Sequence, residues 1–223
     1  MIIRQIPAWV TATNAWVAAS EPGGAAFIVD APPEAAEEVG GYVAELGLTV
    51  GAVLLTHGHV DHMGGSAAIT RLTGATAWVH PDDDFLTLDP VTQIRRLFGM
   101  VPPGEFDPPA DLGRLEDGQT FDLAGTRVEV VHTPGHTPGH CCFHLPGEGV
   151  LFSGDQLFAG SIGRTDLPGG SYEALMESMA ERVLVLDDGT RVLPGHGPET
   201  TIGMERRHNP FLQGLEPRDS GQR

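Results

Sequence analysis

The chain contains no lysine, and all 13 of its basic side chains are arginines. Its 30 aspartates and glutamates outnumber them, so the formal net charge is −17 at pH 7. A surface this acidic repels phosphate backbones, which argues against nucleic acid as the main partner. A local group of arginines still suits a smaller anion.

Long apolar runs and cysteines are also scarce. No apolar stretch approaches the roughly 20 residues that span a bilayer, and no basic segment followed by a long apolar one stands at the N-terminus. The only cysteines, Cys141 and Cys142, are adjacent and point to opposite faces on a strand, so they predict no intramolecular disulfide. We expect them to be buried as small apolar residues, with a catalytic or metal-binding thiol as the alternative. We therefore expect a soluble, cytoplasmic protein without a membrane partner.

The remaining pattern predicts many short strands and a few helices. Of the 223 residues, 40% are hydrophobic, which is enough for a substantial core. Apolar runs bounded by glycine and proline predict strands at residues 1–6, 15–19, 25–30, 50–55, 75–80, 113–121, 125–131, 141–145, 149–152 and 191–193. Helical spacing of apolar residues predicts helices at residues 34–46, 66–72, 91–98 and 172–186.

We find no domain linker in this pattern, so we expect a single domain over residues 1–212 and a frayed tail over residues 213–223. Residues 82–109 are less regular, with proline pairs at 102–103 and 108–109. Irregular insertions of this kind commonly border functional sites. We hypothesise that this segment forms a mobile wall over a site.

A dense group of potential metal ligands follows the apolar run at residues 53–55. Three histidines and an aspartate stand within six residues: His57, His59, Asp61 and His62. Imidazole is the commonest protein ligand for zinc and related ions, and a carboxylate adds a harder oxygen donor. The alternative is a polar, histidine-rich loop that binds no metal.

Three later apolar runs also end in a glycine-flanked histidine or aspartate, at His136, Asp155 and His196. This repetition is difficult to attribute to core packing, because a carboxylate is rarely buried without a partner. His132 and His140 lie closer to the strands, so we expect structural roles or hydrogen bonds to the ligands. His80, at the end of another strand, has an expected structural or surface role.

The His-x-His-x-Asp-His loop, followed in order by His, Asp and His on later loops, resembles the signature of the metallo-β-lactamase superfamily over about residues 50–196. The resemblance implies an α/β fold, a four-layered αβ/βα sandwich of two mostly antiparallel sheets flanked by helices, with two metal ions at one edge. It implies the following metal ligands: His57, His59 and His136 for one ion, Asp61, His62 and His196 for the other, and Asp155 as a bridge. Zinc is the expected divalent metal, with iron and manganese as alternatives.

Within this superfamily, the sequence resembles glyoxalase II, because Asp155 stands where the best-known dizinc β-lactamases carry a cysteine. Residues 163–166 and 194–203 are similar to the short bacterial hydroxyacylglutathione hydrolase-like proteins. The resemblance implies hydrolysis of a thioester of a small thiol, such as S-lactoylglutathione, by a metal-bound hydroxide that Asp61 orients as a catalytic group. Arg164 is the expected substrate anchor. The chain lacks the lysines with which full-length glyoxalase II grips glutathione, and the 27 residues after His196 do not predict its C-terminal helical domain.

Three other functions remain open. The first is a mononuclear iron persulfide dioxygenase, whose family has a segment similar to residues 163–166 but tends to carry Pro-Ala-His-Asp where Pro194-Gly195-His196-Gly197 stands here. The second is a nuclease of the same fold, which the acidic charge disfavours. The third is a metal-binding module without catalysis. We expect the partner to be a small-molecule thioester substrate and the protein to be a monomer or homodimer.

Overall fold

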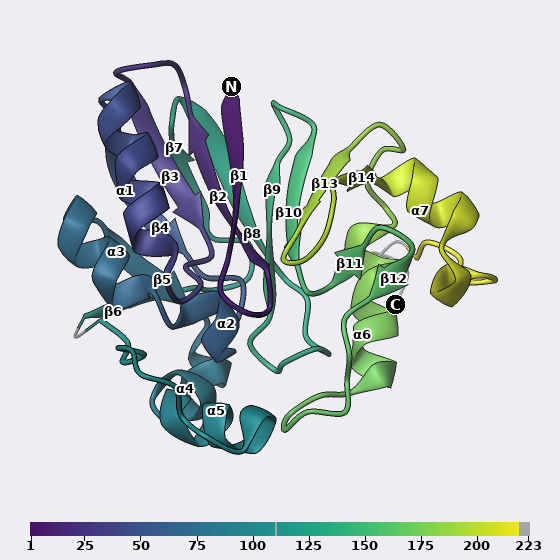
Figure 1. Cartoon of the computed structure of the whole chain (residues 1–223). Helices are drawn as coiled ribbons and strands as arrows, with labels where there is room; N and C mark the ends of the chain where they lie inside the picture. Colours follow the sequence, from purple (N-terminus) through teal and green to yellow (C-terminus); the bar gives the residue numbers. More distant parts are fainter. Residues whose placement is uncertain (110, 219–223) are drawn as a thin grey trace.

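The computed structural model describes residues 1–109 and 111–218, in which two six-stranded sheets face each other (Figure 1). The first sheet has the order β1 (Ile2–Ala8), β2 (Thr13–Ala19), β3 (Ala25–Val29), β4 (Thr49–Leu54), β5 (Thr76–Val79) and β6 (Leu112–Arg114). The second has the order β14 (Thr200–Thr201), β13 (Arg191–Pro194), β10 (Val150–Gly154), β9 (Cys141–Leu145), β8 (Thr126–His132) and β7 (Thr120–Leu123). A short hairpin joins β11 (Leu157–Phe158) to β12 (Ser161–Ile162).

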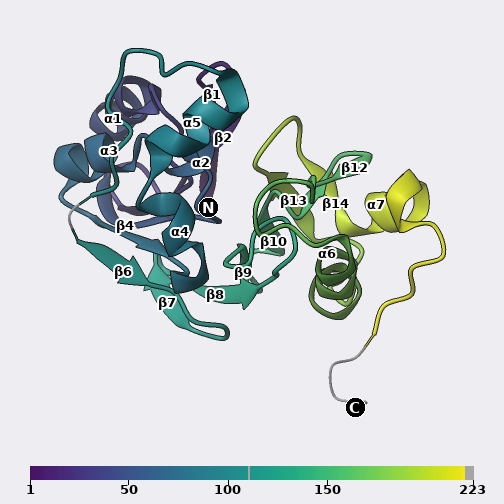
Figure 2. The ribbon, with the colours of Figure 1, turned by 90° about the horizontal axis from the view of Figure 1, so that it is seen from below.

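Helices cover the outer face of each sheet. The first sheet is covered by α1 (Ala35–Leu46) and α3 (Ser66–Thr73), and the second by α6 (Tyr172–Ser178), its π-helical continuation Met179–Val183, and α7 (Ile202–His208), followed by the short 3₁₀ turn Pro210–Leu212. Near the edge where the sheets meet lie α2 (Val60–Met63), the 3₁₀ turn η1 (Pro81–Asp83), α4 (Asp84–Thr87) and α5 (Pro90–Phe98) (Figure 2).

Three hydrophobic layers hold this arrangement together. One layer, which includes Ile28 and Val39, packs β1 to β5 against α1 and α3. The middle layer lies between the sheets, where the rings of Phe27 and Phe152 meet edge to face at 5.9 Å. The third, which includes Leu175, packs the second sheet against α6. These layers confirm the predicted four-layered αβ/βα sandwich, because each sheet buries both faces.

Each sheet is mixed, so the prediction of mostly antiparallel sheets holds for the second sheet and is wrong for the first. In the first, β1, β2 and β3 pair antiparallel, whereas β3 to β6 pair parallel. In the second, β10 and β13 form the one parallel pair among the described strands. The carboxyl ends of β3 and β4 therefore lie at one end of their sheet, and those of β10 and β13 lie together in theirs. Six of the seven predicted ligands follow three of these four strands, and His136 follows β8.

Two predicted elements differ from the structure. The strand predicted at residues 113–121 is two strands, β6 and β7, which belong to different sheets because a turn at Gly118, with φ 75°, separates them. The helix predicted at residues 172–186 begins at Tyr172 with Ser171 as its N-cap, but it changes to a π-helix at Met179 and ends at Val183. After Val183 the chain forms a β-turn, in which Leu186 donates its backbone N–H to the Val183 carbonyl.

The cysteines occupy opposite faces of β9, as predicted. Cys141 packs between the sheets, and Cys142 packs under α6. In the predicted tail, Arg218 donates its backbone N–H to Ala180, while residues 219–223 lie outside the described part of the chain. No helix within residues 1–109 and 111–218 combines the length and apolar character needed to cross a bilayer.

Candidate metal centre

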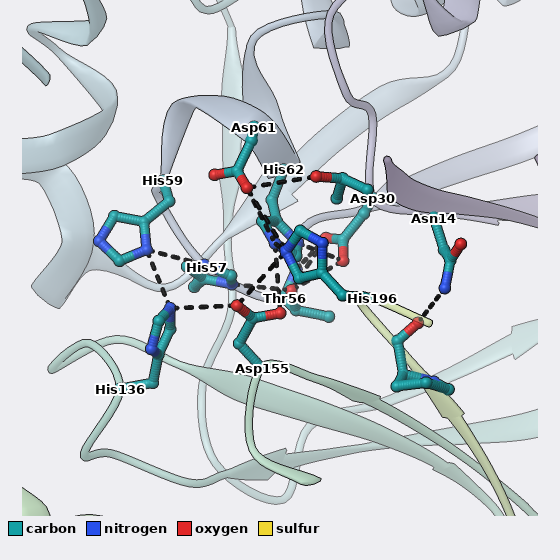
Figure 3. Close-up of polar contacts among 12 residues, drawn as sticks. Asn14, Asp30, Thr56, His57, His59, Asp61, His62, His136, Asp155 and His196 are labelled. Atoms are coloured by element: carbon teal, nitrogen blue, oxygen red, sulfur yellow. Dashed lines mark hydrogen bonds and ion pairs between the residues drawn. The ribbon is translucent and has the colours of Figure 1, made fainter. Parts of the chain in front are cut away.

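All seven predicted ligands come together where the two sheets meet (Figure 3). They come from five places in the chain: the loop after β4, helix α2, the loop between β8 and β9, and the ends of β10 and β13. Parallel strands place their carboxyl ends at a common edge, so residues far apart in sequence meet there. Their function as ligands remains a proposal, which the geometry below supports.

Asp30, directly after β3, anchors the loop that carries the first ligands. Its buried carboxylate accepts hydrogen bonds from the Thr56 backbone N–H at 2.8 Å and from the Thr56 hydroxyl, and it lies 2.9 Å from His62 Nδ1. With Nδ1 donating to Asp30, His62 keeps its Nε2 lone pair for a metal. Asp30 itself has a φ of 60°, which is uncommon for a residue other than glycine, so these bonds hold a strained backbone in place.

The three-histidine group consists of His57, His59 and His136. His59 Nδ1 lies 3.0 Å from His57 Nε2 and 2.9 Å from His136 Nε2. Atoms bound tetrahedrally at roughly 2.0–2.1 Å from a zinc ion stand about 3.3 Å apart, so these nitrogens are close to the spacing for a common ion. The remote nitrogens are held elsewhere, His57 Nδ1 beside the Thr56 hydroxyl at 3.0 Å and His136 Nδ1 donating to the Arg164 carbonyl at 2.7 Å.

The mixed group consists of Asp61, His62 and His196. His196 Nε2 lies 3.3 Å from His62 Nε2 and 3.4 Å from Asp61 Oδ2. His62 Nε2 and Asp61 Oδ2 are 3.8 Å apart. The Thr13 hydroxyl donates to the same Asp61 oxygen at 3.2 Å. This set of two nitrogens and one oxygen suits a second divalent ion.

Asp155 lies between the two groups. Its Oδ2 is 3.5 Å from His136 Nε2 and 3.6 Å from His196 Nε2, and its Oδ1 is 3.3 Å from His62 Nε2. Oδ1 is buried without a hydrogen-bond partner. Gly195 makes room for it, because a Cβ there would stand 2.4 Å from Oδ1. One carboxylate thus faces both candidate metal positions.

The electrostatics favour the metal-binding forms of four of these side chains. Burial and the neighbouring histidines lower the pKa of His57 well below its ordinary value, and burial and His136 lower the pKa of His59 to about 3. Burial alone would raise the pKa of Asp61, but His62 and a hydrogen bond from His196 bring it to about 2. Burial likewise opposes ionisation of Asp155, yet facing histidines hold its pKa well below the usual range. Neutral imidazoles and ionised carboxylates are the forms that bind metals.

These observations meet the test of fit for two divalent cations. Converging imidazole nitrogens at about 3 Å repel one another unless a proton or cation lies between them, and the orphaned Asp155 oxygen requires a partner. Burial disfavours protonated His62, but three surrounding aspartates raise its pKa well above the ordinary value. The mixed group therefore attracts positive charge, and the three-histidine group brings neutral imidazole nitrogens together.

The other residues singled out from the sequence have supporting roles. His140 is buried and accepts the Asp155 backbone N–H at 3.1 Å, so it positions the carboxylate's backbone rather than bonding the carboxylate itself. His132 Nε2 donates to the Pro138 carbonyl at 2.8 Å. Arg164 contributes its carbonyl to His136, while its exposed guanidinium forms two hydrogen bonds to Asp166, both 2.7 Å long.

Sequence reasoning missed Asp30 and Thr13. Asp30 had a usable signal, because it ends an apolar run as Asp155 does. Thr13 had none, since its contact with Asp61 depends on β2 lying beside the end of β13, where Thr13 forms a bridge with His196.

A cleft opens above the candidate ligands. Its walls combine apolar side chains with one arginine: Trp9, Leu97, Phe158, Ile162, Leu167 and Arg164. His59, Asp61, His136, Asp155 and His196 form its floor. The cleft encloses about 510 Å³, within the range of small-molecule sites. Leu97 belongs to the segment expected to form a mobile wall; it does line the cleft, and its mobility stays a prediction.

A model of the metallo-beta-lactamase superfamily matches residues 8–196, and the chain belongs to this superfamily. It is similar to the hydroxyacylglutathione hydrolase GloC of Haemophilus influenzae, with 39% identity over 187 residues that cover 84% of this chain and 87% of that protein. The relationship confirms the predicted superfamily and its glyoxalase II-like subgroup.

Solved structures agree. BLEG-1, described as a B3 metallo-beta-lactamase, has a TM-score of 0.85 and 38% identity, covering 96% of this chain and 100% of that one. TTHA1623, solved in a di-iron-bound form, has a TM-score of 0.82 and 37% identity, covering 94% and 100%. Together with the clustered histidines and aspartates, these relationships indicate a metal-dependent hydrolase that uses divalent ions.

Proposed function

We propose that the protein hydrolyses a thioester of a small thiol, with two divalent ions held by the three-histidine group and the mixed group. The observation that carries the proposal is Asp155, whose carboxylate faces both groups with one oxygen unpartnered. The similarity to GloC supports the substrate class. When bound, the two ions act as Lewis acids and make a nucleophile available from water at neutral pH.

The residues of the chain supply orientation and proton handling. Asp61 is ionised and fixed by the Thr13 hydroxyl, so its carboxylate accepts a hydrogen bond from the attacking water and aims it at the carbonyl carbon. A departing thiol has a pKa of about 8.5, so it leaves as a thiolate with little help from an acid. Among the described residues of the cleft walls, Arg164 is the one cation available to a substrate.

The proposed assay separates three chemistries that this family of sites supports. Purified protein with counted metal is offered S-lactoylglutathione, a chromogenic β-lactam and glutathione persulfide, the last with oxygen uptake followed. The β-lactam is included because of the similarity to BLEG-1. We expect thioester cleavage at about two metal ions per chain. Oxygen consumption with one iron per chain, or cleavage of the β-lactam alone, would overturn the proposal.

Arg164 provides a test of substrate anchoring. Its guanidinium lies at the cleft wall, so Arg164→Ala should raise KM for an anionic thioester several-fold, about what an exposed charged contact contributes. The turnover number should change little, because the backbone carbonyl that orients His136 remains. Steady-state kinetics on charged and neutral thioesters measure the effect, and identical kinetics for both enzymes would show that Arg164 is no anchor.

A further inference from the structure

Two buried polar side chains outside the ligand set bind the peptide groups around the three-histidine group. The first is Asp83, which is fully buried and is the last residue of η1. Its Oδ2 accepts the Gly58 N–H at 2.8 Å and the Thr137 hydroxyl at 2.7 Å, and its Oδ1 accepts the Gly139 N–H at 2.7 Å. Gly58 separates His57 from His59, and Thr137 directly follows His136. One carboxylate therefore ties both loops of the group together.

The second side chain is Gln93, in α5. Its Nε2 donates to the Gly58 carbonyl at 3.0 Å and to the Leu86 carbonyl at 2.7 Å, and its Oε1 accepts the Val60 N–H at 3.1 Å. Peptide groups on both sides of His59 are thus bonded to Gln93.

Glycines in the two loops permit this close approach. A Cβ at Gly139 would stand 2.8 Å from Asp83 Cγ, and one at Gly58 would stand 3.0 Å from Asp83 Cβ and 2.9 Å from Leu86 Cβ. All three distances are shorter than or at the limit of ordinary Cβ contacts. Gly58 of the His-Gly-His segment and Gly139 of the second Thr-Pro-Gly-His segment are therefore both fitted to Asp83.

We propose that Asp83 and Gln93 are positioning residues that hold His57, His59 and His136 at the spacing needed for one metal ion. The proposal rests on the proposed two-metal centre and adds that different residues support its two metal positions. The mixed group has a different support, since Asp30 holds His62 and Thr13 holds Asp61. Loss of either positioning residue should therefore weaken one metal position and spare the other.

Metal titration tests this asymmetry without reference to activity. Asp83→Asn leaves one acceptor oxygen for three donors and sets its NH2 group against at least one of them, and Gln93→Glu removes the donors to Gly58 and Leu86; both keep the side-chain size. Zinc is titrated against a chelating dye to obtain two stepwise dissociation constants, and anomalous diffraction at limiting zinc identifies the occupied position. We expect one constant to rise about 10- to 100-fold, as for other residues that support metal ligands, with the mixed group still occupied.

Asp82→Asn is the matched control, because Asp82 is a neighbouring aspartate with an exposed side chain. It should leave both constants unchanged. Unchanged constants in Asp83→Asn and Gln93→Glu, or an equal weakening of both positions, would overturn the proposal.

Amide hydrogen exchange in the metal-free protein gives an independent result. Asp83→Asn should speed exchange at Gly58 or Gly139, whichever faces the new NH2 group. Gln93→Glu should keep the bond to Val60 and loosen the loop around it. The Thr56 amide, bonded to Asp30, should keep its wild-type rate. Wild-type rates at Gly58 and Gly139 in the folded Asp83→Asn variant would refute the positioning role. A wild-type protein that binds no zinc would instead refute the proposed centre.

Discussion

At the scale of single residues, Asp155 has the most consequential position, because one carboxylate faces both groups of candidate ligands. Asp155→Ala should lose affinity at both metal positions by more than the roughly 100-fold expected for a supporting residue. Thioesterase activity should fall with it. Metal content after dialysis measures the loss, and a fully metallated, active variant would show that Asp155 is not the bridge.

The seven candidate ligands were predictable because each lies in a loop after an apolar run and together they match the ordered signature of the superfamily that the sequence resembles. Asp83 and Gln93 were not. Asp83 stands among three consecutive aspartates, a pattern typical of an exposed turn, and Asp82 is indeed exposed. The partners of Asp83 and Gln93 are mainly backbone groups far along the chain, and a backbone group has no residue type by which to recognise it.

At the scale of elements, His80 directly follows β5 and His132 is the last residue of β8, and their two rings stack. The centroids of His80 and His132 are 4.2 Å apart and the rings are 10° from parallel. Burial and then His132 lower the pKa of His80 below its ordinary 6.5, against the opposing effect of Asp82, Asp83 and Asp117. The unfolded chain therefore binds a proton at His80 more tightly than the folded one does.

It follows that the contribution of His80 to stability is complete above about pH 6.5 and is lost as pH falls through the lower folded pKa. Thermal unfolding between about pH 7.5 and 5.5 should show a smaller decrease in Tm for His80→Gln than for the wild type. The comparison isolates this pair from the other buried histidines, which both proteins share. Parallel curves for the two proteins would contradict the prediction.

Most elements could be predicted from apolar spacing and from glycine or proline at their ends. The division of residues 113–121 between two sheets could not, because β6 and β7 both read as short apolar runs and sheet membership depends on distant strands. The π-helical turn at Met179–Val183 was also unpredictable, since the apolar spacing there fits an α-helix equally well.

At the scale of the whole molecule, the two proposed ions connect the two halves of the sandwich. His57 and His59 follow a strand of the first sheet, whereas His136 precedes a strand of the second. Ions that bind only the folded state stabilise it by about 2.7 kcal/mol each at a free concentration 100-fold above Kd. Chelation should therefore lower Tm, and zinc should restore it. Calorimetry with and without a chelator checks this, and an unchanged Tm would be evidence against ions joining the halves.

The cysteines described with β9 have a consequence for the proposed thioester hydrolysis, which releases a thiol. Each side chain is packed in a separate hydrophobic layer, and burial raises the pKa of Cys142 to about 12 and that of Cys141 well above its ordinary value. Thiolates, not thiols, exchange with disulfides, so neither cysteine forms a mixed disulfide with a released or oxidised product. We therefore expect reactive sulfur compounds to leave both cysteines unmodified.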